Sequence, residues 1–474
     1  MLLMLIVILL SFTCIVINGY HISNRIVRSS SSLYSIQASK WMDEIGKKDI
    51  NVNVVTTNDA KLVCKAINSI KKGDAVFSLP MGLCLDASKA AAMFSSVITP
   101  SKLRTGDIGM LALLLIAEKS LGLASKYANY IQSLPNPPGV LAWNNDLVDE
   151  FVSSTTRSVE SQNKAVDYDA EIVKKLTSIN PILFPPSQYT AEAFKWAMAT
   201  VKSRYVIVEG KPVLAPGMDY MEFDPLSSAE PTVQSAGPFG GKVLVVFAER
   251  SYEKGEDVVM SYGLKGSAEC LEDHGIVPDI TLDDACCEFA VSIDGTEKYA
   301  DDKIDILERQ GYGNSLSVDL EAELSSEIDP ALLQFLRLKF MEGKDSFILE
   351  ACFSNTVWYQ LSLPFSKGNE IKVFEYMLKE CEANLNKINS ASKGNDDSIA
   401  KGNDIKAALA RLRLQEKAAL QGTIKKVQLE LSMLNSLDTR EYYQERRLRE
   451  LDLLKPLDDN EIVMPGERGN SDDY

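Results

Sequence analysis

The sequence predicts an α+β fold in which a β-rich domain, split by a helical insert, is followed by an all-α C-terminal domain. Three observations support this prediction. Residues 242–262 contain two apolar runs around a Lys-Gly-acid turn, and residues 69–80 repeat that scheme. Between the repeats, Ile108–Glu118 is almost continuously apolar and too short to span a bilayer, which favours a buried helix. From about Asp284 onward, apolar residues recur at the 3.6-residue spacing of helices.

The second repeat predicts a β-hairpin. A run rich in β-branched residues, Lys242–Ala248, precedes the turn Lys254-Gly255-Glu256, and a second apolar run, Val258–Tyr262, follows it. Gly255 supplies the conformational freedom that such a turn needs. A short helix is expected from about Ala268 to Asp273, ended by Gly275.

Tyr262 closes this repeat and directly precedes a glycine. A phenol at the end of a strand projects beyond the sheet edge, where it can line a polar pocket or cap a hydrophobic core. The residue type alone leaves both interpretations open.

The two repeats and their separation resemble the two halves of a SET domain, the fold of protein lysine methyltransferases. The type they resemble is Rubisco large-subunit methyltransferase, in which a helical insert splits the SET domain and a helical substrate-binding domain follows. The resemblance covers about Trp41 to Leu454. It implies a protein-lysine N-methyltransferase that uses S-adenosylmethionine, with Tyr262 at the position of the catalytic tyrosine. We also expect the strands around Val76 and Val259 to be adjacent.

Three retained positions are implied to bind the cofactor. Ser203 and Arg204 match the family's Ser-Arg pair near the cofactor, and Asp219 matches the acidic residue of a Pro-x-x-Asp segment. An arginine on an apolar helix needs an anionic partner or solvent. A cofactor carboxylate would serve, and so would Glu209 or a surface position. The family's aromatic stretch is matched by Tyr127, Tyr130 and Trp143, which we interpret as core residues.

Other positions that the resemblance assigns to the site are altered. Asp59-Ala60-Lys61 replaces a Gly-x-Gly that lets the backbone approach the cofactor, so Ala60 falls at a cofactor position without its glycines. Glu222 and Phe223 replace an Asn-His pair, which holds the cofactor partly through main-chain atoms that any side chain can supply. A Glu222 carboxylate would repel the anionic end of the cofactor, whereas Phe223 could stack on the adenine or be buried. His274-Gly275-Ile276 replaces Tyr-Gly-Phe, which places His274 in the substrate-lysine pocket and Ile276 over the cofactor.

The termini indicate targeting segments. Residues 1–17 are apolar, and residues 20–42 contain no acidic residue but several basic ones and a four-serine run. This order predicts a bipartite presequence for plastid import; the alternatives are the secretory pathway, or a membrane anchor if the apolar segment is not cleaved. The predicted segments are a signal peptide at 1–19, a transit-peptide-like segment at 20–40, a SET domain at 41–282 with its helical insert at about 91–210, a helical substrate-binding domain at 283–456 and a disordered acidic tail at 457–474.

The composition argues against several other functions. A net charge of −16 disfavours nucleic-acid binding, which depends on clustered Lys and Arg. It fits a basic protein partner better, although solubility alone would also explain the charge. Two histidines, His21 and His274, nearly exclude a Ser/His or Cys/His hydrolase. Eight cysteines without a CxxC pair predict free thiols and no metal site.

Two functional hypotheses remain. The first is a plastid protein-lysine methyltransferase, in which positioning and exclusion of water drive an in-line methyl transfer to a neutral lysine amine. Free lysine has a pKa of about 10.4, and desolvation in a narrow channel lowers it without a dedicated base. The second hypothesis is a catalytically inactive SET-like module that binds proteins through its helical domain. The altered cofactor positions favour the second, and the retained Ser203, Arg204, Asp219 and Tyr262 favour the first.

Overall fold

The computed structural model describes residues 33–46, 50–57, 61–158, 160–235, 241–351, 354–392, 394–436, 438–451 and 453. The signal peptide, most of the predicted transit segment, Ala60 and the predicted acidic tail lie outside these residues. The chain divides into two compact units. Unit 1 comprises Met1–Val148 and Val159–Pro278, and unit 2 comprises Asp149–Ser158 and Asp279–Tyr474.

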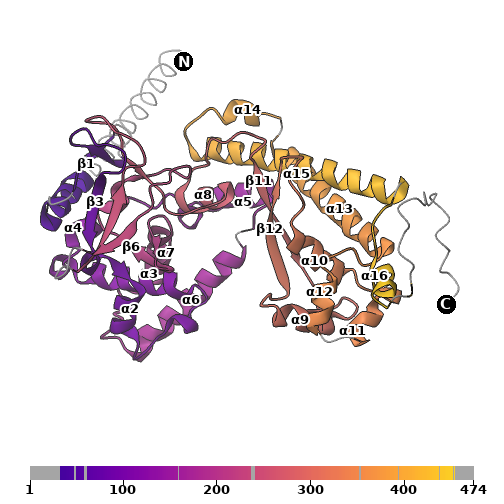
Figure 1. The fold of residues 1–474 in the computed structure, drawn as a ribbon. Helices are drawn as coiled ribbons and strands as arrows, with labels where there is room; N and C mark the ends of the chain where they lie inside the picture. Colours follow the sequence, from indigo (N-terminus) through magenta and orange to yellow (C-terminus); the bar gives the residue numbers. More distant parts are fainter. Residues whose placement is uncertain are drawn as a thin grey trace, which may run out of the picture. The chain divides into compact units, whose positions relative to one another are not determined.

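Unit 1 contains small sheets built from short strands (Figure 1). β1 (Val52–Thr56) pairs antiparallel with β2 (Leu62–Ala66), and β9 (Lys242–Phe247) lies between β3 (Ala75–Pro80) and β8 (Thr232–Ser235). β6 (Lys211–Leu214) lies between β4 (Leu85–Asp86) and β5 (Val206–Val208), and β7 (Glu222–Phe223) runs parallel to β10 (Val259–Met260). β3 is the second apolar run of the first repeat.

The predicted hairpin is wrong. β9 pairs with β3 and β8, whereas β10 pairs with β7, so the strands around Val76 and Val259 are not partners in one sheet. The two repeats instead meet just before their turns, where Ile70 and Tyr252 exchange two main-chain hydrogen bonds of 2.9 Å. Gly255 has a φ of +86°, as its turn requires.

Helices fill the chain between β4 and β5. They are α2 (Ala87–Phe94), α3 (Gly106–Ser120), α4 (Ala128–Ser133), α5 (Asn145–Ser154), α6 (Glu160–Ile179) and α7 (Ala191–Lys202). α3 is buried throughout its middle, as its continuous apolar sequence predicts. α7 ends at Lys202, and residues 206–208 form β5.

The first described residues of unit 1, 33–45, form a helix. Its Ala38 is fully buried, and its Trp41 donates a 2.9 Å hydrogen bond from Nε1 to the carbonyl of Pro216. The folded unit therefore begins before Trp41, and the predicted boundary between residues 40 and 41 falls within this helix.

Unit 2 is mostly helical and also carries one antiparallel strand pair, β11 (Cys286–Ser292) and β12 (Ser315–Glu321). Its helices are α9 (Ala300–Arg309), α10 (Pro330–Lys339), α11 (Phe347–Ala351), α12 (Ser354–Gln360), α13 (Lys367–Ser392), α14 (Asp396–Ile399), α15 (Ile405–Ser436) and α16 (Tyr443–Glu450). α13 and α15 run along one another (Figure 1). The α+β class is confirmed, with the strand pair as an addition to the helical domain.

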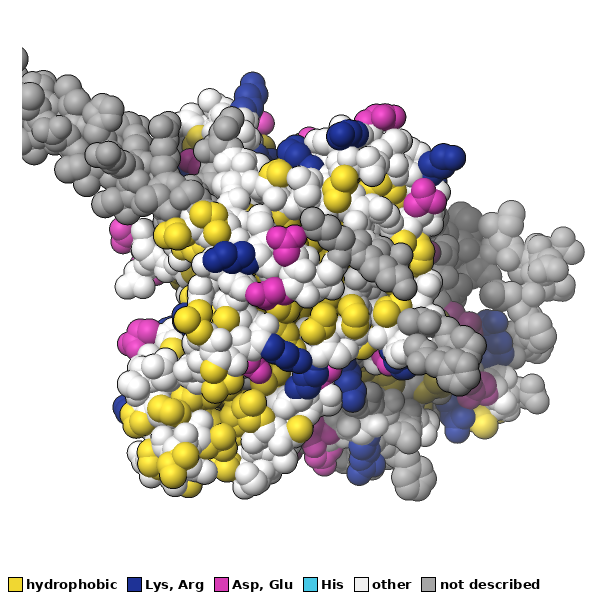
Figure 2. Space-filling view, turned by 90° about the vertical axis from the view of Figure 1, so that its left-hand side faces the viewer, with side chains coloured by type: hydrophobic (Ala, Val, Ile, Leu, Met, Phe, Trp, Pro, Cys, Tyr) yellow, Lys and Arg dark blue, Asp and Glu magenta, His cyan; other side chains and the backbone are white. Residues whose placement is uncertain are grey.

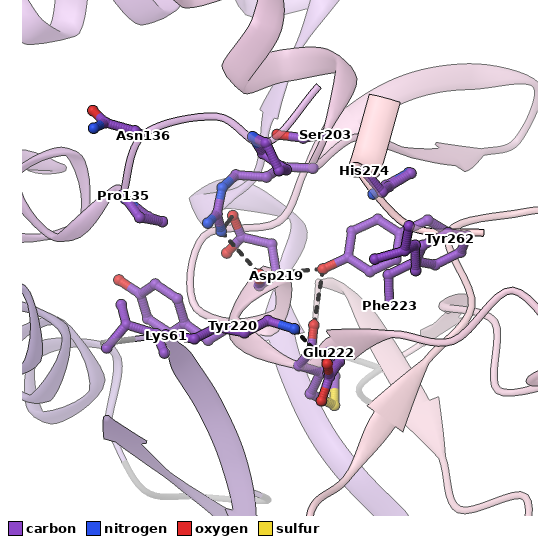
Figure 3. A pocket seen from close by; sticks show the side chains of 15 residues that line it. Lys61, Pro135, Asn136, Ser203, Asp219, Tyr220, Glu222, Phe223, Tyr262 and His274 are labelled. Atoms are coloured by element: carbon purple, nitrogen blue, oxygen red, sulfur yellow. Dashed lines mark hydrogen bonds and ion pairs between the residues drawn. The ribbon is translucent and has the colours of Figure 1, made fainter. Parts of the chain in front are cut away.

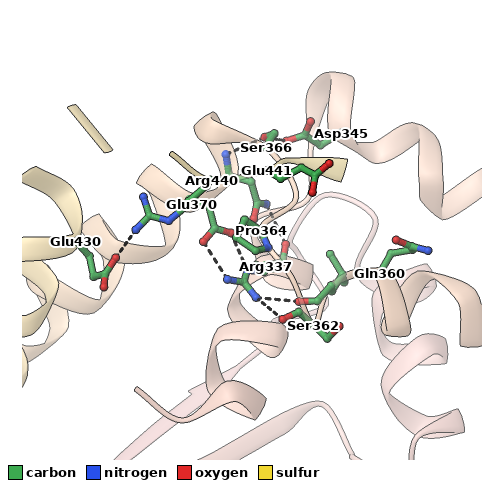
Figure 4. A network of polar contacts seen from close by, with 12 residues as sticks. Arg337, Asp345, Gln360, Ser362, Pro364, Ser366, Glu370, Glu430, Arg440 and Glu441 are labelled. Carbon is green, nitrogen blue, oxygen red and sulfur yellow. Dashed lines mark hydrogen bonds and ion pairs between the residues drawn. The ribbon is translucent and has the colours of Figure 1, made fainter. Parts of the chain in front are cut away.

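Buried ion pairs connect the helices of unit 2. The Arg337 guanidinium donates to both carboxylate oxygens of Glu370, at 2.6 and 3.0 Å, and to the carbonyls of Leu361 and Ser362 (Figure 4). The short helix α14 precedes α15, and its buried Asp396 accepts hydrogen bonds from Arg413. Separating the two partners of such a pair would leave a buried charge without compensation, which is costly. The pairs therefore hold the helices in position.

The face of the protein seen in Figure 2 is not strongly charged. Figure 2 shows acidic and basic side chains interspersed, with hydrophobic side chains gathered in the lower part of this face. The six described cysteines are free, as predicted. None of the helices in the described part of the chain has the length and hydrophobicity of a membrane span. The described residues also contain no His, Cys, Asp and Glu cluster arranged to hold a metal ion.

Candidate active site

A cavity of about 320 Å³ lies in unit 1 (Figure 3). Its walls come from the start of β2, the loop after α4, the end of α7, β7 with the turn before it, and the segment from β10 to just beyond α8 (Ser267–His274). The structure brings together every described residue that the sequence assigned to the site: Ser203, Arg204, Asp219, Glu222, Phe223, Tyr262, His274 and Ile276.

A buried ion pair forms one wall of the cavity. Arg204 follows α7, and its Nη1 donates to Oδ2 of Asp219 at 3.1 Å and to the Asp219 carbonyl at 2.9 Å. The other oxygen of this carboxylate, Oδ1, accepts the main-chain N–H of Gly217 at 2.9 Å, and Oδ2 also accepts the Tyr130 hydroxyl at 2.7 Å. Asp219 is therefore the partner of Arg204, a question that the sequence left open, and Tyr130 supports the pair from the core.

The geometry around Asp219 depends on Gly217. This residue has a φ of +98°, which L side chains rarely adopt, and an added Cβ would lie 3.0 Å from Nε1 of Trp41. Burial by itself would lower the pKa of Arg204, but the Asp219 carboxylate and the Tyr130 and Tyr262 hydroxyls together outweigh it, so the pKa lies above its ordinary value. The guanidinium is a fixed positive charge.

Tyr262 lies beside this pair with its hydroxyl in a defined position. The hydroxyl is within 3.1 Å of two main-chain carbonyls, those of Asp219 and Met221, and donates its proton there. The side chain is 4% exposed. Burial and the nearby Asp219 carboxylate raise the pKa of Tyr262 well above its ordinary value. The phenol therefore stays neutral, and its oxygen lone pairs remain available as acceptors.

Three rings form an aromatic wall next to the Tyr262 hydroxyl. The Phe223 ring lies 4.0 Å from the His274 ring, between centroids, and 31° from parallel. Tyr262 meets Phe223 edge-on at 5.4 Å and His274 at 5.5 Å. Phe223 is thus packed against a neighbouring ring of the protein while it still lines the cavity.

His274 is a neutral member of this wall. Burial and the positive charge of Lys265 lower its pKa from 6.5 to about 3. Its Nε2 is buried and has no hydrogen-bond partner among the described residues. A neutral imidazole has one donor and one acceptor nitrogen, so this side chain can bind a further polar group but cannot act as a cation near neutral pH.

The remaining predicted residues contribute less distinctive contacts. The Ser203 hydroxyl donates to the Thr200 carbonyl at 3.1 Å, within the end of α7, and Ile276 presents an apolar side chain. Tyr220 also lines the cavity, and its hydroxyl hydrogen-bonds to Ser133. Tyr220 could not be assigned to the site from the sequence, because a tyrosine near an apolar run fits a core position equally well.

Lys61 also lines the cavity, although no motif in the sequence assigns a role to its side chain. It lies just before β2, where the resemblance marked only a lost glycine, and its ammonium forms an ion pair with Glu222 (Figure 3). The two side chains are 55% and 38% exposed. The negative charge of Glu222, expected to repel an anionic ligand group, thus has a positive partner beside it.

Comparisons with known proteins agree with this architecture. The family model for Rubisco LSMT substrate-binding matches residues 294–420. The chain is 28% identical over 439 residues to a chloroplastic [fructose-bisphosphate aldolase]-lysine N-methyltransferase of Arabidopsis thaliana, covering 88% of this chain and 86% of the relative. It is also 28% identical to the chloroplastic Rubisco large subunit N-methyltransferase of Pisum sativum, over 87% of this chain and 85% of that protein.

Solved structures show the same fold. A structure of Rubisco LSMT bound to AdoMet superposes with a TM-score of 0.72 at 23% identity, covering 89% of this chain and 97% of the other. A structure of the SET domain of LSMT bound to lysine and AdoHcy gives the same values. The split SET domain with an appended helical domain is therefore the fold of this chain.

Proposed function

We propose that this chain, a SET-domain protein of the Rubisco large-subunit methyltransferase type, transfers the methyl group of S-adenosylmethionine to a lysine side chain of a plastid protein. The observation that carries the proposal is the Tyr262 hydroxyl, which two main-chain carbonyls fix at the wall of a cavity that also holds the other retained residues. The relatives that resemble this chain over most of their length are named as chloroplastic protein-lysine methyltransferases.

The cavity fits the cofactor in size and in chemistry. Its volume of about 320 Å³ is at the lower end of the range for small-molecule sites. It offers an aromatic face, apolar contacts and accessible charges of both signs. Ser203, Arg204, Asp219, Glu222, Phe223 and Ile276 are the proposed cofactor residues. Asp219 acts through Arg204, since protein groups occupy both of its carboxylate oxygens.

When bound, S-adenosylmethionine supplies an electrophilic sulfonium methyl group. The protein positions the lysine amine for an in-line approach. The Tyr262 oxygen, whose proton points to main-chain carbonyls, can accept an N–H of the amine and orient its lone pair. His274 is proposed to line the lysine pocket, where its unpartnered nitrogen can make a second hydrogen bond to the amine.

The amine has to be neutral to react. The buried walls around Tyr262 and His274 disfavour an ammonium, which lowers the lysine pKa. His274 does not serve as the base, because its own pKa of about 3 is too low to hold a proton near neutral pH. We propose that the proton leaves to solvent as the lysine enters the pocket.

The helical unit is proposed to dock the protein substrate, because the family model that matches it describes substrate binding. Plastid import through the presequence at residues 1–40 is proposed from its composition and from the chloroplastic relatives. The secretory and membrane-anchored alternatives would leave the mature N-terminus at different residues, so sequencing the mature N-terminus distinguishes them.

Calorimetric titration of S-adenosylmethionine into the folded mature chain tests the proposed function. Binding in the micromolar range is expected, with S-adenosylhomocysteine competing for the same site. No binding to a protein shown to be folded would overturn the proposal and favour the inactive protein-binding module, which needs no methyl donor.

A further inference from the structure

We propose that Lys61 and Glu222 form a clamp for the amino-acid end of S-adenosylmethionine, in which Lys61 binds the carboxylate and Glu222 binds the ammonium. The inference rests on the proposed function and adds a recognition device to it. The resemblance places a glycine at the position of Lys61 and an asparagine at that of Glu222, so both charges are features of this chain.

The charges of the cavity fall into two pairs. Among the described residues that line it, the charged side chains are Lys61, Arg204, Asp219 and Glu222. Arg204 and Asp219 are 14% and 1% exposed and neutralise one another inside the wall. Lys61 and Glu222 are 55% and 38% exposed, so they are the pair that a ligand can reach.

The backbone on both sides of this pair is well fixed. The Lys61 carbonyl accepts the main-chain N–H of Thr57 at 2.8 Å, and the Lys61 N–H donates to the Thr57 hydroxyl at 3.2 Å. Glu222 begins β7 and stands in register with Val259 of β10. The Lys61 side chain therefore extends from the residue just before β2 and the Glu222 side chain from β7, and the two can move apart without a change in the fold.

Opening the pair costs little, because an exposed ion pair adds little to stability. A ligand with a single charge would satisfy one of the two side chains and leave the other without its partner. A zwitterion satisfies both, and it exchanges one ion pair for two charge-assisted contacts. The methionine portion of S-adenosylmethionine carries an α-ammonium and an α-carboxylate, which is the charge pattern that this pair complements.

The test compares ligands that differ by one charged group. Binding of S-adenosylmethionine and of its decarboxylated analogue is measured by calorimetry for the wild type, Lys61→Met and Lys65→Met. Lys65 is the matched control, because it lies on β2, forms an ion pair with Asp257 at 2.6 Å and does not line the cavity. A second pair of measurements uses Glu222→Gln with S-adenosylmethionine and an analogue that lacks the α-ammonium.

We expect Lys61→Met to weaken S-adenosylmethionine binding about tenfold, as for the loss of one charge-assisted hydrogen bond. The same change should leave the affinity for the decarboxylated analogue unaltered or raise it, because that analogue has one more net positive charge. Lys65→Met should bind both ligands as the wild type does. Glu222→Gln should lose affinity only for the ligand that carries the ammonium.

Two outcomes would overturn the clamp while leaving the proposed function in place. In one, Lys61→Met keeps the full preference for the carboxylate-bearing ligand. In the other, Lys65→Met loses as much affinity as Lys61→Met, which would indicate a general effect of charge. If the folded wild type does not bind S-adenosylmethionine at all, the proposed function fails and the clamp fails with it.

Discussion

Replacing Asp219 by asparagine tests whether the ion pair with Arg204 holds the wall of the cavity together. The carboxylate accepts from Gly217, Tyr130 and Arg204 at 2.9, 2.7 and 3.1 Å. An asparagine offers one oxygen and one NH₂, so at least one of these donors would face another donor. The Arg204 guanidinium, 14% exposed, would lose the charge that offsets its burial.

Breaking a buried pair by removing one partner costs about 3–5 kcal/mol. Total stabilities are about 5–15 kcal/mol, so the variant should remain folded but with a much reduced margin. If the free energy of unfolding falls by about 2 kcal/mol per molar of urea, a loss of about 4 kcal/mol of stability lowers the unfolding midpoint by about 2 M. S-adenosylmethionine binding should weaken too, because Arg204 would no longer be fixed.

Urea unfolding followed by tryptophan fluorescence measures this effect, since Trp41, Trp143 and Trp196 lie in unit 1. Asp257→Asn is the matched control, because its ion pair with Lys65 is exposed and such pairs contribute about 0–1 kcal/mol. Equal midpoints for the two variants would refute the role given to the buried pair.

Three further changes have expected outcomes. Tyr262→Phe should lower methyl transfer at least about 100-fold, as for the loss of an oriented hydroxyl, and reduce stability by only about 1–2 kcal/mol; normal turnover in single-turnover assays would contradict the role of Tyr262. The folded pKa of His274 is about 3 against 6.5 in the unfolded chain, so stability present above pH 6.5 is lost as the pH falls toward 3, by up to about 4 kcal/mol. His274→Phe should remove this part of the pH dependence in urea titrations. The same difference in unfolding free energy between pH 7 and pH 4 in this variant as in the wild type would contradict the role given to His274. Glu416 in unit 2 has a pKa raised to about 7, chiefly by burial, so the stability it contributes below pH 4.5 is lost as the pH rises through 7. The free energy of unfolding of Glu416→Gln, relative to that of the wild type, should therefore rise by up to about 3 kcal/mol between pH 4.5 and pH 8. A relative gain at acidic pH instead would show the opposite linkage.

Local patterns predicted the elements well and their partners poorly. α3 follows from its continuous apolar run and α15 from its apolar spacing, because a helix is closed by hydrogen bonds within one segment. The strand β9 is equally clear from its β-branched residues, but its partner β3 comes from far earlier in the chain. Alternation specifies which side of a strand is buried and not which strand lies next to it, so the predicted hairpin was wrong. The β11–β12 pair was not predicted because its two strands lie next to strongly helical segments.

The site was predicted as a set of positions and not as a set of interactions. The resemblance named eight residues that the structure brings to one cavity. It could not show that Asp219 is the partner of Arg204, because their contact depends on the left-handed turn at Gly217. The low pKa of His274 arises from burial, which the sequence does not show. The role of Lys61 could not be predicted, because it depends on the ion pair with Glu222, a residue far away in the sequence.

The most direct test of the proposed chemistry is transfer of a labelled methyl group. The mature chain is incubated with S-adenosylmethionine labelled in its methyl group and with soluble plastid proteins, and the products are hydrolysed and separated as amino acids. The proposed function predicts label in methylated lysine with the wild type and almost none with Tyr262→Phe. A wild-type protein that binds S-adenosylmethionine but places no label in lysine would contradict it.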